Sequence, residues 1–281
     1  MTYIMLLVTA FFASLQNIVS KEYNIKTKGK DIYLYTAVVA ATAMIFFILT
    51  SGGSFEFNFH SAIYSAAFAL CYLSAVVGMI KSIECGPLSV SSLINQCSLI
   101  IPTLYGVAIL NEKLKIWGYI GIVLLFVSLF LVKPKNSGKA KITPKWFVWV
   151  NIGFVGNGMC STVQKMQQLK FDGAYKNEFM IIALCICAVV MSVASLLGVK
   201  EKRDVKSIFK FAPIQGFANG VVNMLVMVLT ALLPAAILFP VVLAGGITIT
   251  FIVSVTVFKE RLTACQLVGY MIGILSIVFM C

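Results

Sequence analysis

Amide side chains recur at helical spacing within otherwise apolar stretches of this sequence. Gln215, Asn219 and Asn223 follow one another at intervals of four, which places three amides on one face of a helix. Hydrocarbon offers no hydrogen bonds, so polar side chains inside membrane helices are candidates for contacting a polar solute. The candidate solute-binding residues on the first, third, fourth, sixth and eighth apolar stretches are Gln16, Asn17, Tyr72, Asn95, Gln96, Asn157, Gln215, Asn219 and Asn223.

A structural role for the same side chains stays open. Asn, Gln and Ser in membrane helices often hydrogen-bond to neighbouring helices, and Gly216-x-x-x-Gly220 is typical of close helix packing. Gln16 and Gln164 stand near the ends of apolar stretches, where they can face interfacial water instead. The three stacked amides of the eighth stretch favour a cavity, because packing alone does not need them.

Ionisable chemistry is missing from the middle of every apolar stretch. The sequence places no Asp, Glu, Lys, Arg or His deep in any of them, and His60 is the single histidine. Intramembrane proteolysis needs a Ser/His pair, paired aspartates or a zinc helix, so we expect no enzyme. The eight cysteines form no C-x-x-C pair, so we expect no metal and no cofactor.

Two glutamates stand in short polar turns between apolar stretches, in Asn111-Glu112-Lys113-Leu114 and Lys259-Glu260-Arg261-Leu262. Either glutamate could carry protons. The flanking basic residues favour a helix-boundary ion pair or a helix cap that fixes the turn.

Bulk composition predicts a membrane protein. The 281 residues are 60% hydrophobic and 11% charged, with a mean hydropathy of +0.98, whereas soluble domains carry roughly 25% charged residues. Uninterrupted apolar runs exclude the alternating pattern of a barrel, so we expect an all-α fold with ten transmembrane helices. The expected spans are 2–20, 32–51, 61–80, 87–110, 116–132, 146–164, 179–199, 211–231, 234–258 and 263–281.

Basic residues gather in alternate loops. Of the 22 Lys and Arg, 17 lie in the odd-numbered loops, and the other five are Lys113, Lys115, Lys165, Lys170 and Lys176. The positive-inside rule would then place the odd loops in the cytoplasm and both termini outside. Basic loops of this kind report membrane topology, so the net charge of +12 predicts no nucleic-acid partner.

An internal repeat joins the two halves of the chain. With an offset of 148 residues, Glu112 falls on Glu260, Gly121 on Gly269 and Ser128 on Ser276. Each half has five spans, on either side of the basic linker 133–145. Because five is an odd number of membrane crossings, the second half starts on the opposite side of the membrane, and the two halves have opposite orientations. Inverted repeats are typical of secondary transporters, whose solute site lies between the halves.

The two glutamate turns resemble the paired signature of the drug/metabolite transporter superfamily, EamA-like branch. Pro102 precedes the first turn, and a glycine follows each glutamate by nine residues, Gly121 after Glu112 and Gly269 after Glu260. The resemblance implies two EamA-like five-helix repeats, 1–132 and 146–281, and a central cavity. It also implies a multi-pass protein of the inner (cytoplasmic) membrane, with a small-molecule solute and membrane lipid as partners, as a monomer or homodimer. The family usually starts in the cytoplasm, whereas the charge count predicts the reverse, so the orientation stays open.

These observations predict a facilitator, exchanger or exporter of small neutral or zwitterionic metabolites such as amino acids, working by alternating access. Small multidrug relatives place a carboxylate in their first helix, where this chain has Gln16 and Asn17. Export of cationic drugs or quaternary amines is therefore the alternative, and a membrane-embedded enzyme or a channel is less favoured.

Overall fold

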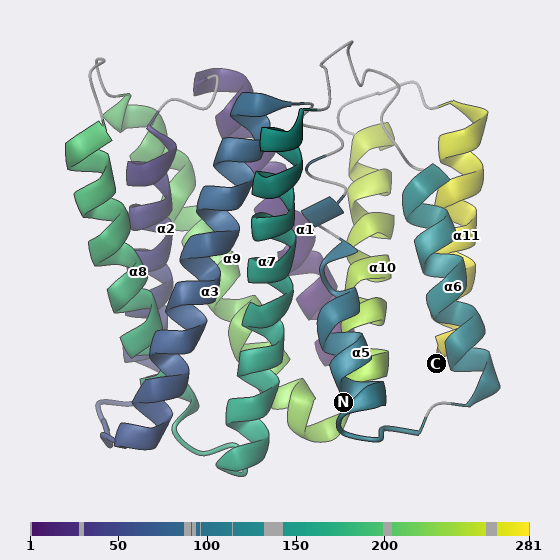
Figure 1. The fold of residues 1–281 in the computed structure, drawn as a ribbon, viewed down its shortest axis with the longest axis horizontal. Coiled ribbons are helices and arrows are strands. Elements are labelled where there is room, and N and C mark those ends of the chain that lie inside the picture. Colours follow the sequence, from purple (N-terminus) through teal and green to yellow (C-terminus); the bar gives the residue numbers. More distant parts are fainter. Residues whose placement is uncertain are drawn as a thin grey trace.

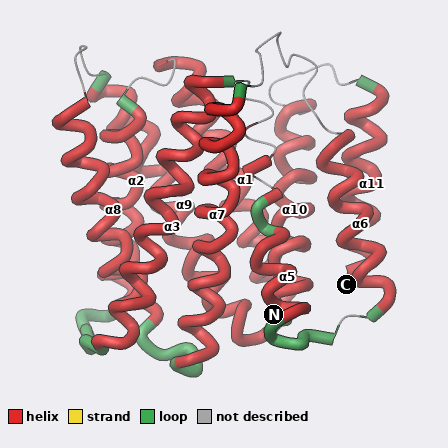
Figure 2. Tube along the Cα trace, viewed as in Figure 1, coloured by secondary structure: helices red, strands yellow, loops and turns green. Residues whose placement is uncertain are grey.

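The computed structural model is an all-α bundle, as predicted (Figures 1 and 2). It describes residues 2–27, 31–86, 91, 94, 95, 97–113, 115–131, 143–198, 204–256 and 263–280. Within these residues the helices are α1 (Thr2–Thr27), α2 (Ile32–Thr50), α3 (Phe59–Cys85), α5 (Ile100–Ala108), α6 (Ile116–Leu131), α7 (Pro144–Lys170), α8 (Lys176–Gly198), α9 (Val205–Leu232), α10 (Ala235–Thr256) and α11 (Ala264–Met280).

Each expected span contains one of these helices, but the fourth span, 87–110, is not one continuous helix. Residues 91, 94, 95 and 97 are helical, Ser98 and Leu99 form a turn, and α5 begins at Ile100. The backbone N–H of Ile101 donates to Ser98 O at 2.9 Å across this turn. The fourth span is therefore interrupted by a backbone turn, which its continuous apolar composition does not mark.

Several helices extend beyond the apolar windows. α7 begins at Pro144, with Thr143 as its N-cap, and continues to Lys170 instead of ending at residue 164. Lys165 is consequently buried inside a helix. The expectation that Lys165 lies in a loop was wrong, because the expected span ends before this first charged residue whereas the helix continues to Lys170.

Hydropathy and length mark five helices as able to cross a membrane: α1, α2, α3, α8 and α9. Three shorter apolar segments lie in α6, α10 and α11. Large apolar side chains such as Leu7, Leu70 and Leu197 are exposed on the outside of the bundle. A bilayer accounts for this outer surface, since water does not favour so much exposed hydrocarbon.

The main helix contacts join the first half of the chain to the second. α3 packs on α7 and α1 on α9, while α2 packs on α8, α6 on α11 and α5 on α10. Between the halves, α1 corresponds to α7, α3 to α9 and α5 to α10. The contact of α1 with α9 therefore corresponds to that of α7 with α3, and the contact of α1 with α10 to that of α7 with α5. All four contacts are present. This reciprocal packing is what an inverted repeat produces.

One end of the bundle carries both termini, at the bottom of Figure 1. The connections after α2, α5, α7 and α9 lie at the same end. We call this end the termini face. A cluster of buried apolar side chains that includes Leu6, Val226, Leu229 and Leu238 joins α1, α9 and α10.

Candidate solute-binding site

Four amides from three helices form one hydrogen-bonded network, which we call the amide network: Gln16 of α1, Gln164 of α7, and Asn219 and Asn223 of α9. Asn219 Nδ2 donates to Gln16 Oε1 at 3.1 Å. Asn223 Nδ2 donates to Asn219 Oδ1 at 3.0 Å, and Gln164 Nε2 donates to Asn223 Oδ1 at 2.8 Å. The network thus links the two halves of the chain through α9.

Gln164 belongs to the network, although its position near a span end predicts contact with interfacial water. It is 3% exposed and also lies 3.8 Å from Met180 Sδ, so it does not face interfacial water. The charge of Lys165, which follows it, is the only sequence feature that puts Gln164 near a span end. The continued helical pattern to Lys170 is the signal that could have moved it into the interior.

Gln215 has a different partner, although it shares a helix face with Asn219 and Asn223. Its Oε1 accepts a short hydrogen bond from the hydroxyl of Tyr35 on α2. The Tyr35 ring stacks on Tyr23, with ring centroids 3.9 Å apart. This amide therefore holds α2 to α9 in the present conformation.

Asn157 and Asn95 meet at the break in the fourth span. Asn157 Nδ2 donates to Ser98 Oγ at 2.6 Å and to the backbone oxygen of Asn95 at 3.3 Å. That oxygen also accepts from the Ser98 N–H at 3.2 Å, so Asn157 reinforces the turn that ends the helical segment. Asn95 Oδ1 is buried without a hydrogen-bond partner among the described residues. Gln96 lies outside them.

Asn17 and Tyr72 keep polar groups that the described residues do not use. Asn17 follows Gln16 and is turned about 100° from it around α1, and its side chain is exposed. The Tyr72 ring stacks on Phe68 at a centroid distance of 6.2 Å. No hydrogen bond joins either side chain to another residue in the described part of the chain, so both can serve a solute.

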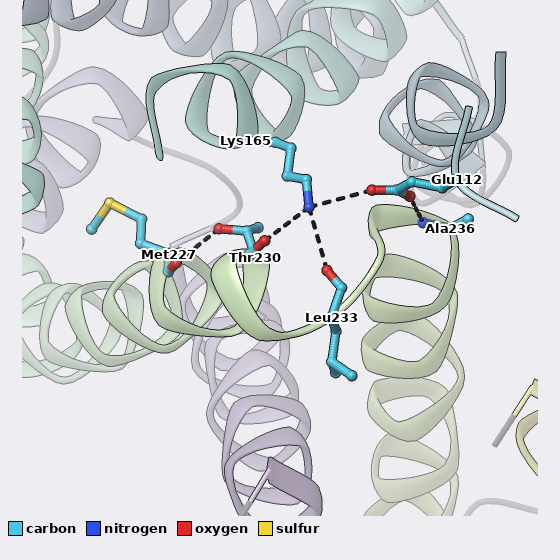
Figure 3. A network of polar contacts seen from close by, with 6 residues as sticks. All are labelled: Glu112, Lys165, Met227, Thr230, Leu233 and Ala236. Atoms are coloured by element: carbon cyan, nitrogen blue, oxygen red, sulfur yellow. Dashed lines mark hydrogen bonds and ion pairs between the residues drawn. The ribbon is translucent and has the colours of Figure 1, made fainter. Parts of the chain in front are cut away.

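Near the termini face, Lys165 forms a polar cluster with the α9–α10 turn and the connection after α5 (Figure 3). Lys165 Nζ donates to Thr230 O at 2.8 Å and to Leu233 O at 3.3 Å, both at the end of α9. It also lies 3.4 Å from Glu112 Oε1, and the two side chains are only 4% and 13% exposed. The cation thus sits at the electronegative end of a helix.

The backbone after α5 explains why Glu112 reaches this position. Asn111 has a φ of 52°, in the left-handed region that asparagine tolerates better than most residues. The Glu112 N–H then donates to Gly106 O at 3.0 Å. A Cβ on Gly106 would lie 2.3 Å from Glu112 Oε2, so glycine leaves the space for the carboxylate.

Glu112 also caps α10, because its Oε2 accepts from the N–H of Ala236 at 3.1 Å. The sequence interpretation of this glutamate as a helix-boundary ion pair or cap is therefore confirmed. Its partners, however, are Lys165 and α10 of the other half, and not its basic neighbours in sequence. Glu260 lies outside the described residues.

Comparison with known proteins indicates which class of membrane protein this chain resembles. Residues 1–133 match the model of the EamA-like transporter family. The match covers 133 of the 281 residues, and over them the sequence is similar to that of EamA-like transporters. A solved crystal structure superposes on 99% of this transporter and 95% of its own chain, with a TM-score of 0.82 and 10% identity, which shows the fold alone. No curated protein matches the sequence.

The match indicates a secondary transporter with a small-molecule substrate and a multi-pass membrane fold, of which the described residues form ten helices. EamA-like transporters are not enzymes, so none of the polar residues above is assigned a catalytic role. No group of three or more His, Cys, Asp or Glu capable of holding a metal ion occurs within the described ranges.

A groove of about 670 Å³ lies elsewhere on the transporter, between α3 and α7. Its walls include Leu70, Phe147, Val148 and Val155, which are all exposed on the outside of the bundle. The asparagine in this groove, Asn151, donates to Phe147 O of its own helix at 2.8 Å. The groove faces the bilayer and lies apart from the amide network, so we do not assign the solute to it.

Proposed function

We propose that the transporter moves small neutral or zwitterionic metabolites, such as amino acids, by facilitated diffusion or exchange. The observation that carries this proposal is the chemistry of the amide network. Its four members are uncharged, and each amide both donates and accepts hydrogen bonds. Such groups can exchange their mutual bonds for bonds to a solute that also carries donors and acceptors.

The charges nearest to the network argue against a cationic solute. Lys165 directly follows Gln164 on α7, and its only carboxylate contact among the described residues is Glu112. A lipophilic cation would find no free carboxylate there to replace its lost hydration. Export of cationic drugs therefore has less support than transport of a polar, uncharged or zwitterionic metabolite.

We further propose the division into repeats 1–132 and 146–281 around the linker 133–145, in the cytoplasmic membrane. The reciprocal contacts of α1 with α9 and of α3 with α7 support it. In this arrangement Gln16 and Tyr72 come from the first repeat, whereas Asn219 and Asn223 come from the second. A solute between them would contact both repeats, as alternating access requires.

The proposed residues fall into two groups by their present bonding. Five of them already have hydrogen-bond partners, which they would have to exchange for the solute: Gln16, Asn157, Gln215, Asn219 and Asn223. Asn17, Tyr72 and Asn95 keep unused polar atoms. We expect the first group to link solute binding to helix movement and the second group to receive the solute first.

Replacing Asn219 or Asn223 with alanine is expected to abolish solute binding. A solute at about 100 times its dissociation constant stabilises the folded wild-type protein by about 2.7 kcal/mol. Thermal unfolding in detergent, with amino acids and other polar metabolites set against lipophilic cations, measures this effect. We expect polar metabolites to raise the melting temperature of the wild type and to leave Asn219→Ala and Asn223→Ala unchanged.

Asn151→Ala is the matched control, because it removes an intramembrane asparagine outside the network. It should keep the full ligand-induced shift. A shift produced by lipophilic cations alone would overturn the proposed solute class. An undiminished shift in both α9 variants would instead move the site away from the network.

A further inference from the structure

The ion pair between Lys165 and Glu112 has no part in the amide network, yet it joins the two halves of the chain. Glu112 follows α5 in the first half, whereas Lys165, Thr230, Leu233 and Ala236 belong to the second. Among the six residues in Figure 3, Glu112 alone comes from the first half. Every polar bond that crosses between the halves in this cluster therefore ends on its carboxylate.

The contacts of the two side chains are unequal, which indicates which one moves. Lys165 Nζ keeps two carbonyl partners at the end of α9 even without Glu112. Glu112 has both of its carboxylate contacts, Lys165 and Ala236, in the other half. If α5 moves away from α7 and α10, the carboxylate leaves and the lysine stays with α9.

Apolar packing lies directly behind this ion pair. Val226 stands one helical turn before Thr230 on α9 and is 7% exposed. It packs in the same cluster as Leu6 of α1 and Leu238 of α10. A path from the termini face to the interior between these helices would have to part the ion pair first and this cluster next.

We propose that the Lys165–Glu112 ion pair is the gate contact that holds the termini face of the transporter closed, and that it breaks each time this face opens. The proposal rests on the transporter fold and on the contacts of Glu112, and not on the identity of the solute. An ion pair with both partners largely buried suits this role. It is strong while water is excluded and weakens once water enters.

The test measures access to the region behind the ion pair without any substrate. Val226→Cys places a thiol there, and a membrane-impermeant maleimide reports its exposure in proteoliposomes. The same protein without Val226→Cys supplies the background from the native cysteines. Glu112→Gln removes the charge but keeps an oxygen that can accept from the Ala236 N–H, so it isolates the ion pair from the helix cap.

Glu112→Gln is expected to raise about tenfold the rate at which the maleimide modifies the introduced thiol. This rise corresponds to a closed state that is less stable by about 1.4 kcal/mol. The control is Glu84→Gln, which breaks the exposed Lys81–Glu84 ion pair of 2.8 Å near the opposite end of the bundle. This control should leave the rate unchanged. An unchanged rate in Glu112→Gln, or an equal rise in Glu84→Gln, would overturn the proposal.

If Glu112→Gln cannot be purified in folded form, Glu112→Asp supplies the second variant. It keeps the charge but shortens the side chain by one methylene, so it cannot hold both Lys165 and Ala236 at their present distances. A smaller rise in modification is then expected, and no rise would count against the gate. Because this readout needs no solute, its failure is distinguishable from failure of the proposed amide site.

Discussion

Lys165→Met is expected to destabilise the transporter by about 3 kcal/mol or more, since removing one partner of a buried ion pair leaves the other charge uncompensated. The substitution leaves Glu112 largely buried without its cation, and it deprives Thr230 O and Leu233 O of their donor. Thermal unfolding in detergent should show a melting temperature several degrees below that of the wild type.

Lys81→Met is the matched control for this substitution. Lys81 also pairs with a glutamate, at 2.8 Å, but the two side chains are 36% and 52% exposed. Exposed ion pairs contribute roughly 0–1 kcal/mol, so its melting temperature should stay near that of the wild type. Equal melting temperatures for Lys165→Met and Lys81→Met would show that the buried cluster contributes no more than a surface pair.

Gly78→Ala is expected to prevent α3 from packing on α7. A Cβ at Gly78 would lie 2.4 Å from Gly153 N and 2.7 Å from Gly153 Cα, and both of these atoms belong to the backbone. No side-chain rotation relieves such a contact, so the two helices must separate. We expect a loss of about 3 kcal/mol or more, seen as a low yield of monodisperse protein in size-exclusion chromatography.

Gly198→Ala provides the comparison, because among the described residues no atom outside the local helix lies within 4 Å of the position that its Cβ would occupy. This variant should be purified like the wild type, since alanine also favours a helix over glycine. Normal yield and melting temperature in Gly78→Ala would mean that the α3–α7 crossing is looser than the distances indicate.

The sequence carried enough information to find the helices and not enough to find their interruptions. Hydropathy locates α2 and α8 within a few residues, because their composition changes sharply at both ends. The turn at Ser98 and Leu99 has no such signal. It is supported by Asn157 from another helix, whose side chain donates to the backbone oxygen of Asn95.

The candidate site, too, was predictable only where it depends on local helical spacing. The spacing of Asn219 and Asn223 correctly placed them on one face of α9, but the same spacing gave no indication that Gln215 would bond to Tyr35. Gln164 was missed because a lysine follows it, and a buried lysine needs partners that only the folded chain supplies. Local periodicity fixes a helix face, whereas the partner of each amide depends on the packing of distant segments.

Glu112 illustrates how a local interpretation can be correct for reasons that lie elsewhere in the fold. The turn Asn111-Glu112-Lys113 indicated a helix boundary, and Asn111 does adopt the left-handed conformation there. The cap and the ion pair both form across the two halves, with Ala236 and Lys165. Only the reciprocal packing of the halves brings these residues together.

We propose that the amide network binds an uncharged or zwitterionic solute during exchange across the membrane. The most direct test is counterflow in proteoliposomes, in which vesicles loaded with one unlabelled amino acid take up its labelled form. We predict saturable uptake that needs the internal solute, persists in Asn151→Ala and is lost in Asn219→Ala. Uptake that is equally strong in Asn219→Ala, or that occurs only with lipophilic cations, would contradict binding of such a solute at the amide network.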